Sequence, residues 1–372
     1  MKSISPQFII RGLLFPKSER TTISEFRKRV AFAVSPPRRG LSLPVGRQGC
    51  GLIFVLIISF SACKHNQENS QATENTEENK IIKPAFSSDS AYHFIQQQVD
   101  FGPRVPGTSA QQKCASYFEQ KLNAYGAAVI VQKTKVVVYN GKSVPCINVI
   151  ASYNPEVKRR LLICTHWDAR PFADQDDSAV GKPILAADDG ASGSAVLLEI
   201  AGQLHQKNPE IGVDLVFLDV EDYGQPEYDF DQKQGDFYCL GTQYWCKNPH
   251  VPNYRAENGI LLDMVGARGA TFTYEGVSMQ YAPAFMKQVW KNAGALGYGS
   301  FFVKEMTDQI IDDHFYINQL MNIPTIDIIN RTYQTRSGFP KHWHTHDDNM
   351  NIIDKNTLLA VGETVLATIY DF

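Results

Sequence analysis

From about Ser88 onward, apolar and polar positions alternate along the chain with two different periods, one typical of helices and one typical of strands. Apolar side chains stand at helical spacing between Ser109 and Gly126, which predicts an amphipathic helix with Ser109 as its cap and the glycine as its end. Two β-branched runs, 129–139 and 144–153, flank Asn140-Gly141, the strongest short signal for a β-hairpin. We therefore expect the sheet to begin with antiparallel strands.

Farther along the chain, short and wholly apolar segments alternate with longer helical ones. The predicted strands are 161–165, 213–218, 260–262 and 324–329, and the predicted helices include 191–206 and 281–295. This alternation is typical of βαβ crossovers and a parallel sheet that is buried on both faces. The expected fold is a single α/β domain over 88–372, a three-layer αβα sandwich whose mixed sheet is antiparallel at its start and parallel in its core.

The N-terminal segment contains one long apolar run, residues 51–62, which follows several arginines and ends just before Cys63. The run is shorter than the roughly 20 residues that a membrane-spanning helix needs. It has the charged, apolar and small-residue parts of a secretory signal, and Cys63 resembles the lipid-bearing cysteine of a bacterial lipobox, although Phe60 stands where leucine is usual. The alternative is a plain signal peptide with an incidental cysteine.

These features predict three segments along the chain. Residues 1–62 form a signal region, and a mis-assigned start codon is our preferred account of residues 1 to about 45. Residues 63–87 form a lipid-anchored flexible tether, because 64–80 contain almost no apolar side chains that could offset the entropy of ordering. The folded domain of a bacterial lipoprotein, residues 88–372, would then be held at the cell envelope, facing the periplasm or on the outer membrane.

Composition narrows the choice of partners. The 372 residues include 36 Lys and Arg against 39 Asp and Glu, a net charge of −3, and no basic block lies in the main body, which argues against nucleic acid as a partner. Seven cysteines without a C-x-x-C pair argue against a disulfide scaffold or a zinc ribbon. Any metal site must therefore use histidines and carboxylates, and the oligomeric state stays open.

Acidic and histidine side chains follow the predicted parallel strands, where ligands bind in sheets of this kind. They are His166, Asp168, Asp188, Asp189, Glu221, Asp222, Asp263, Asp312, Asp313, His314 and His344. Carboxylates that face one another raise their pKa values or require a cation, and a set of Asp, Glu and His ligands suits Zn²⁺. In the Glu221-Asp222 pair one carboxylate can bind the ion while the other moves protons, and the sequence leaves open which does which.

The strand-end motifs identify a family resemblance. His166-x-Asp168, Asp188-Asp189-Gly190-Ala191-Ser192-Gly193, Glu221-Asp222, Asp263 and His344 resemble the zinc aminopeptidase-like superfamily of co-catalytic metallopeptidases. Within it, segments 101–107, 262–267, 312–314 and 343–345 are most similar to the glutaminyl-peptide cyclotransferases, or glutaminyl cyclases. The resemblance covers about residues 90–372. It implies zinc-dependent cyclisation of the N-terminal glutamine of peptides and proteins to pyroglutamate, with release of ammonia.

The resemblance also implies roles for individual residues. Asp189, Asp222 and His344 would bind one zinc ion, and Glu221 would be the proton shuttle. Further residues are then assigned by their matching positions: Asp263 and Asp313 as catalytic acids beside the metal, and Trp343, Asp312 and His166 as substrate contacts.

Ligand counting does not separate a cyclase from its relatives. In the peptidases of this superfamily, the counterparts of His166 and Asp263 hold a second zinc ion, so a two-zinc aminopeptidase is the alternative function. An inactive ectodomain that only binds peptides is a third hypothesis. The chain departs from the animal cyclases at Asp222, where they carry Glu, at Asp327, where they carry His, and in segment 223–238.

Several nearby residues have two interpretations at this point. His342 and His346 flank His344 and are weaker candidates for the same ligand position. Cys239 and Cys246 either pair or stay free. Four aromatic residues either line a substrate pocket or belong to the core: Tyr223, Phe230, Phe237 and Trp245.

Overall fold

The computed structural model describes residues 83–231 and 234–372. The predicted signal region, Cys63 and most of the predicted tether lie outside these residues. Residues 83–87, which the sequence assigned to the tether, pack on the domain: Phe86 is only 5% exposed and its backbone N–H donates to Glu363 Oε1 at 2.7 Å. The Phe86 ring lies in a notch that only a glycine leaves open, because a Cβ on Gly362 would come within 2.3 Å of it.

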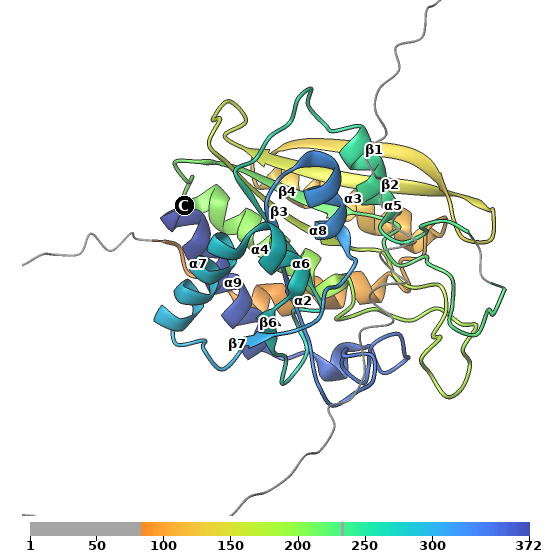
Figure 1. Cartoon of the computed structure of the whole chain (residues 1–372). Coiled ribbons are helices and arrows are strands. Elements are labelled where there is room, and N and C mark those ends of the chain that lie inside the picture. The colour runs from red at the N-terminus through yellow and green to blue at the C-terminus, as the bar shows by residue number, and fades with distance from the viewer. Residues whose placement is uncertain (1–82, 232–233) are drawn as a thin grey trace, which may run out of the picture. The chain divides into compact units, whose positions relative to one another are not determined.

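The described residues contain the following helices and strands (Figure 1). The strands are β1 (Ala128–Val137), β2 (Ser143–Tyr153), β3 (Arg160–His166), β4 (Gly212–Leu218), β5 (Asn258–Asp263), β6 (Phe272–Tyr274), β7 (Phe302–Met306) and β8 (Thr325–Ile329). The helices are α2 (Ser88–Asp100), α3 (Ser109–Ala124), α4 (Ala191–Gln206), α5 (Leu240–Lys247), α6 (Gly276–Tyr281), α7 (Pro283–Ala295), α8 (Asp313–Tyr316), η1 (Ile317–Met321), η2 (Met350–Ile352) and α9 (Lys355–Asp371).

The main sheet has the mixed topology that the sequence predicts. Within the described chain its strand order is β1-β2-β4-β3-β5-β8. β1 pairs antiparallel with β2, and β2 antiparallel with β4, whereas β4, β3, β5 and β8 run parallel to one another. Gly141 takes a φ of 80° in the predicted hairpin turn, a conformation that favours glycine. The first predicted helix is confirmed as α3, although Thr108 rather than Ser109 is its cap.

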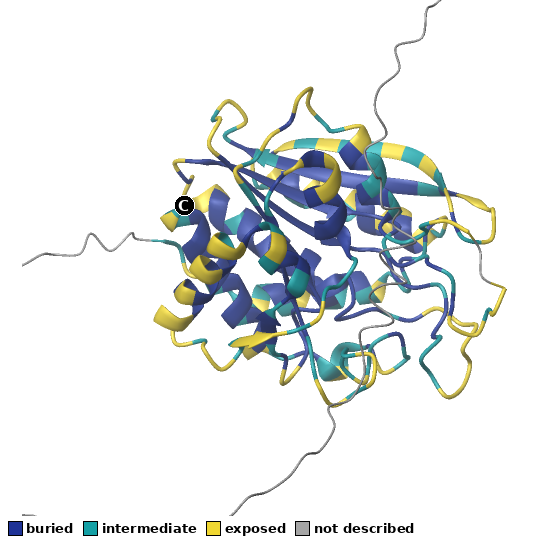
Figure 2. Cartoon of the chain, in the orientation of Figure 1, coloured by how far each residue is buried: buried dark blue, intermediate teal, exposed yellow. Residues whose placement is uncertain are grey.

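Side chains on the two faces of the sheet enter two different cores, which gives the three layers. One face packs against α2, α3, α4, α7 and α9, with Ile163, Leu215 and Phe217 among its members. The other face, with Leu162, Val216 and Leu218, packs against α5 and η1. The parallel strands β3, β4, β5 and β8 are buried between these layers, whereas the edge strand β1 and the outer sides of the helices are exposed in part (Figure 2).

The topology places the carboxyl ends of three neighbouring parallel strands together. β3 lies between β4 and β5, and its last residue, His166, is opposite Leu218 of β4. β5 ends at Asp263. The residues that follow these strands therefore meet at one edge of the sheet, as the sequence analysis expects. None of the helices in 83–231 and 234–372 is both long enough and apolar enough to span a bilayer.

Candidate active site

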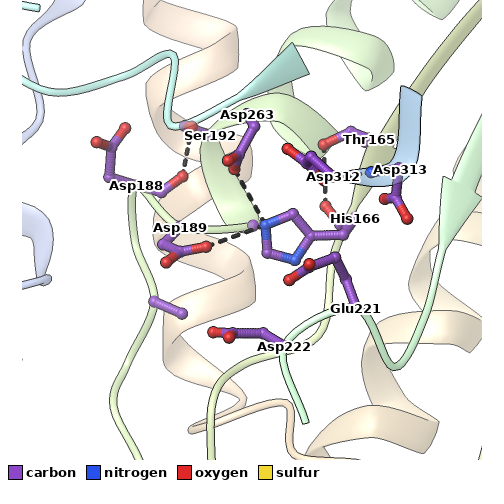
Figure 3. Close-up of polar contacts among 12 residues, drawn as sticks. Thr165, His166, Asp188, Asp189, Ser192, Glu221, Asp222, Asp263, Asp312 and Asp313 are labelled. Atoms are coloured by element: carbon purple, nitrogen blue, oxygen red, sulfur yellow. Dashed lines mark hydrogen bonds and ion pairs between the residues drawn. The ribbon is translucent and has the colours of Figure 1, made fainter. Parts of the chain in front are cut away.

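Two glycines allow the segment that carries Asp189 to approach the sheet. Gly190 has a φ of 107°, and a Cβ there would come within 2.7 Å of the Asp168 carbonyl oxygen. A Cβ on Gly193 would come within 2.2 Å of Thr165 Oγ1. Because only glycine fits both places, α4 begins directly against the strand ends and presents Asp189 to His166 (Figure 3).

The three residues predicted as zinc ligands lie together. Asp189, Asp222 and His344 each offer one ligand atom, and these atoms all lie within 4.8 Å of one another. His344 Nε2 is 3.3 Å from Asp222 Oδ1 and 3.8 Å from Asp189 Oδ2. Tetrahedral zinc with bonds of about 2.0–2.1 Å separates its ligand atoms by about 3.4 Å. The other oxygen, Asp222 Oδ2, is buried without a hydrogen-bond partner, so this donor set fits a bound cation.

A second group shares one of these carboxylates. His166 Nε2 lies 3.0 Å from Asp189 Oδ1 and 3.1 Å from Asp263 Oδ1 (Figure 3). Burial opposes the charging of His166, but its contacts with Asp168, Asp189 and Asp263 raise its pKa well above the ordinary value. Asp189 is thus common to two candidate ligand groups.

Glu221 is not a member of the predicted ligand group but belongs to a neighbouring one, with Cys239 and Asp312. Its Oε1 accepts a hydrogen bond from the Cys239 thiol at 3.2 Å, and the same sulfur lies 4.0 Å from Asp312 Oδ1. Burial and the neighbouring Asp222 raise the pKa of Glu221 well above that of a free glutamate. Burial likewise raises the pKa of Asp312 and of Asp313 to about 7, the first also through Asp263 and the second through Asp312. This side of the site is therefore suited to holding protons near neutral pH.

The backbone is strained around the site. Five non-glycine residues beside it, all in the described chain, have φ between 48° and 57°, which is the left-handed region. They are Ala186, Val220, Cys239, Met264 and His344. Such residues cost of order 1–3 kcal/mol each and persist where the surrounding structure fixes them. At Val220 the left-handed turn directly precedes the Glu221-Asp222 pair and sets the directions in which the two side chains leave the chain.

Buried polar residues whose role the sequence did not reveal hold the loops of the site. Asp348 accepts the N–H groups of Asp188 and Asp189, at 2.7 and 3.1 Å. Arg104, which is fully buried, donates to the carbonyl oxygens of Trp167, Leu185 and Ala186. Arg104 belongs to segment 101–107, so the family motif was visible in the sequence but its contacts were not.

The three histidines of this segment have different partners. His342 Nε2 lies 2.9 Å from Asp188 Oδ2, and His346 Nδ1 lies 2.7 Å from Asp176 Oδ2. Neither belongs to the candidate metal groups found in the described residues, whereas His344 does. Trp343 is half-buried and stacks on Phe339, with ring centroids 4.6 Å apart, so its position at the site is fixed from one side.

The remaining candidates fall into different places. Trp245 is core, with no exposed surface, and Phe230 is 90% exposed, so neither lines a buried pocket. Tyr223 and Phe237 are half-buried. Cys239 and Cys246 are both buried and free, so they do not form a disulfide bridge.

Comparison with known proteins gives the family. Residues 148–369 match the model of peptidase family M28. The chain belongs to peptidase family M28. The matched region contains both candidate ligand groups and the acidic cluster around Glu221.

Solved structures of close relatives include glutaminyl cyclases. The chain is 51% identical to the glutaminyl cyclase of Tannerella forsythia (TM-score 0.76), and the likeness covers 78% of this chain and 100% of that one. It is 49% identical to the Bacteroides thetaiotaomicron glutaminyl cyclase bound to N-acetylhistamine (TM-score 0.77; 78% and 100% covered). A Zn-dependent exopeptidase from Parabacteroides distasonis is 47% identical (TM-score 0.77; 78% and 100%).

A more distant relative is also a glutaminyl-peptide cyclotransferase. The glutaminyl-peptide cyclotransferase of the snake Boiga irregularis is 23% identical over 295 residues, which cover 72% of this chain and 77% of that protein. The family resemblance and the mixed three-layer α/β fold expected from the motifs are therefore confirmed.

Proposed function

We propose that this protein is a zinc-dependent glutaminyl-peptide cyclotransferase that converts the N-terminal glutamine of peptides and proteins to pyroglutamate and releases ammonia. The observation that carries the proposal is the 51% identity to a glutaminyl cyclase over the whole length of that chain. The site geometry supports it, because a ligand group and a proton-holding acid lie side by side but do not overlap.

Asp189, Asp222 and His344 would hold the ion, which supplies Lewis-acid polarisation of the γ-amide carbonyl of the substrate. Glu221 takes a proton from the α-amine as its nitrogen bonds to the side-chain amide carbon, Cδ, and gives that proton to the amide nitrogen as the bond between Cδ and that nitrogen breaks. Ammonia and a five-membered lactam are the products. Both reacting groups belong to one residue, so the site has to fold the side chain back rather than supply water.

The neighbouring acids complete the proposed roles. Asp263, Asp312 and Asp313 face the reacting groups and hold protons, because burial raises the pKa of Asp263 to about 6 and that of the other two to about 7. Trp343 forms one wall for the glutamine side chain. His166 contacts the substrate beside Asp263, and its charge is balanced by the carboxylates around it.

We propose one zinc ion per chain. A two-zinc aminopeptidase is the second candidate, and the group formed by His166, Asp189 and Asp263 is the observation that favours it. The test supplies a Gln-initiated peptide and measures released ammonia, released free amino acids and zinc per chain. Ammonia alone, with one zinc, supports the cyclase. Free amino acids with two zinc ions would support the peptidase. If a zinc-loaded chain releases neither product, the remaining hypothesis is a protein that only binds peptides.

We also propose that the protein is an exported lipoprotein, tethered at the cell envelope through a lipid on Cys63. The apolar run before Cys63 and the polar segment after it support this. Mass spectrometry of the intact mature protein tests it, since a mature chain that begins at Cys63 with acyl groups attached is expected. A chain cut elsewhere, without acyl groups, would contradict the proposal.

A further inference from the structure

A buried ion pair lies behind two of the proposed zinc ligands. The side chains of Arg170 and Asp174 are 1% and 0% exposed, and the guanidinium donates to both carboxylate oxygens, from Nε at 2.7 Å and from Nη2 at 2.6 Å. Arg170 Nη1 also donates to Asp222, to Oδ1 at 2.8 Å and to the backbone oxygen at 3.0 Å. Asp174 Oδ1 lies 3.2 Å from His344 Nδ1. The pair therefore touches one ligand with each of its members.

These contacts leave Nε2 of His344 and Oδ2 of Asp222 available to bind a metal ion. Nδ1 of His344 is buried and makes no hydrogen bond within the described residues, and the Asp174 carboxylate 3.2 Å away is the charge that favours a proton on this nitrogen. The lone pair of Nε2 is then directed toward Asp189 and Asp222. Arg170 binds one oxygen of Asp222 and leaves Oδ2 without a partner. A guanidinium has a fixed fork of donors, so it also fixes the direction of the Asp222 carboxylate.

The pair reaches one further part of the site. Asp174 Oδ2 accepts the backbone N–H of Glu227, at 3.0 Å, from the connection between β4 and α5. The Arg170 guanidinium packs over the ring of Phe172, 4.5 Å from its centroid. The contacts of Arg170 and Asp174 thus come from the loop after β3, the loop after β4 and the loop that carries His344.

We propose that Arg170 and Asp174 are positioning residues that set the affinity of the site for zinc, by orienting Asp222 and His344 before the ion binds. This inference rests on the zinc site of the proposed function. Supporting contacts of this kind change metal affinity by about 10–100-fold when they are removed. Neither residue was singled out from the sequence, and neither belongs to the candidate ligand groups.

The test measures zinc affinity by competition with a chromophoric chelator, on the full chain. Asp174→Asn keeps the shape of the side chain and removes its charge, and we expect its zinc Kd to rise about 10–100-fold. The chain offers a matched control in a second buried pair, in which Arg160 binds Asp214 with Nε at 2.8 Å and Nη2 at 2.7 Å. Asp214 lies in the middle of β4, away from the ligand groups, so Asp214→Asn should lower thermal stability but leave the zinc Kd unchanged.

The outcomes separate the inference from the function on which it rests. If wild type binds no zinc at this site, the zinc site itself is wrong. If wild type binds zinc and Asp174→Asn binds it within threefold as tightly, only the positioning role is wrong. Equal weakening by Asp214→Asn would show a general effect of losing a buried ion pair and would also overturn the inference. Arg170→Lys, which retains the charge but not the fork, is the second variant should Asp174→Asn fail to fold, and a rise of at least tenfold in its Kd is expected.

Discussion

The clearest prediction of the site geometry is that the adjacent acids Glu221 and Asp222 do different things. In Glu221→Gln the side chain keeps its size and still offers an acceptor to the Cys239 thiol, which contacts Oε1. The proton carrier is lost, and the ligand group of Asp189, Asp222 and His344 is untouched. Turnover should therefore fall steeply while the zinc content stays at the wild-type level.

The size of the loss follows from the surroundings of the carboxylate. General acid–base catalysis contributes about 10²–10⁴-fold, or about 3–5 kcal/mol at 1.36 kcal/mol per factor of ten. Burial and Asp222 raise the pKa of Glu221, which suits proton transfer near neutral pH and places the effect above the bottom of this range. Asp312, whose pKa is about 7, lies on the other side of Cys239 and supports a residual rate. We expect kcat to fall about 10³-fold.

The assay measures ammonia release from a Gln-initiated peptide together with zinc per chain, for wild type, Glu221→Gln and Asp222→Asn. Asp222→Asn removes a ligand and should lose zinc. If Glu221→Gln loses zinc and Asp222→Asn retains it, the two roles are exchanged. A Glu221→Gln enzyme that turns over within tenfold of wild type would show that Glu221 carries no proton in the reaction.

Three further predictions concern residues around this pair. Burial, and then Asp312, raise the folded-state pKa of Asp327 well above its ordinary value of 3.8. Its contribution to stability is therefore fully present below pH 3.8 and is lost as the pH rises through the raised pKa. In urea unfolding of zinc-free protein, Asp327→Asn should gain stability relative to wild type from about pH 5 to about pH 8.5, and a relative loss would contradict this. Cys239→Ala removes the thiol donor to Glu221 and should lower kcat about tenfold at unchanged zinc content, whereas Cys239→Ser should stay within about threefold; equal losses in both would point to packing alone. Trp343→Ala removes about 1.5 kcal/mol of apolar contact with the glutamine side chain and should raise KM about tenfold, and an unchanged KM would place the substrate elsewhere.

Much of the fold could be predicted from the sequence, because the spacing of apolar residues and the residues that form turns determine each helix, strand and hairpin over short stretches of chain. The buried parallel strands contain unbroken apolar runs, and the hairpin is marked by Asn140-Gly141, so the antiparallel start and parallel core of the sheet follow directly. Helix α7 shows the limit of this signal. The apolar pattern begins at Tyr281, but Pro283 is its first residue, since proline is favoured there and lacks the N–H that an interior position requires.

The ligand group could be proposed for a different reason, which is that its residues stand in motifs that resemble those of a known family. The supporting residues could not, because their contacts cross long distances in the chain. Arg170 and Asp222 are separated by 52 positions, and Asp188 and Asp348 by 160. A buried arginine or aspartate in a loop has no periodic signature, and its partner is decided only when the loops meet. Sequence reasoning therefore reaches the candidate ligands more easily than the residues that hold them in place.

The division of labour between Glu221 and Asp222 shows what the fold adds to the motif. Two neighbouring carboxylates are chemically alike in the sequence, and either can bind or carry a proton. At Val220 the backbone takes a left-handed conformation and turns away from the direction of β4. The backbone N–H groups of Glu221 and Asp222 then donate to the two carboxylate oxygens of Asp168, at 3.0 and 3.2 Å. With both backbone amides fixed on one carboxylate, the side chains diverge: Asp222 toward Arg170 and His344, Glu221 toward Cys239. The role proposed for each acid thus follows from backbone geometry rather than from its chemistry.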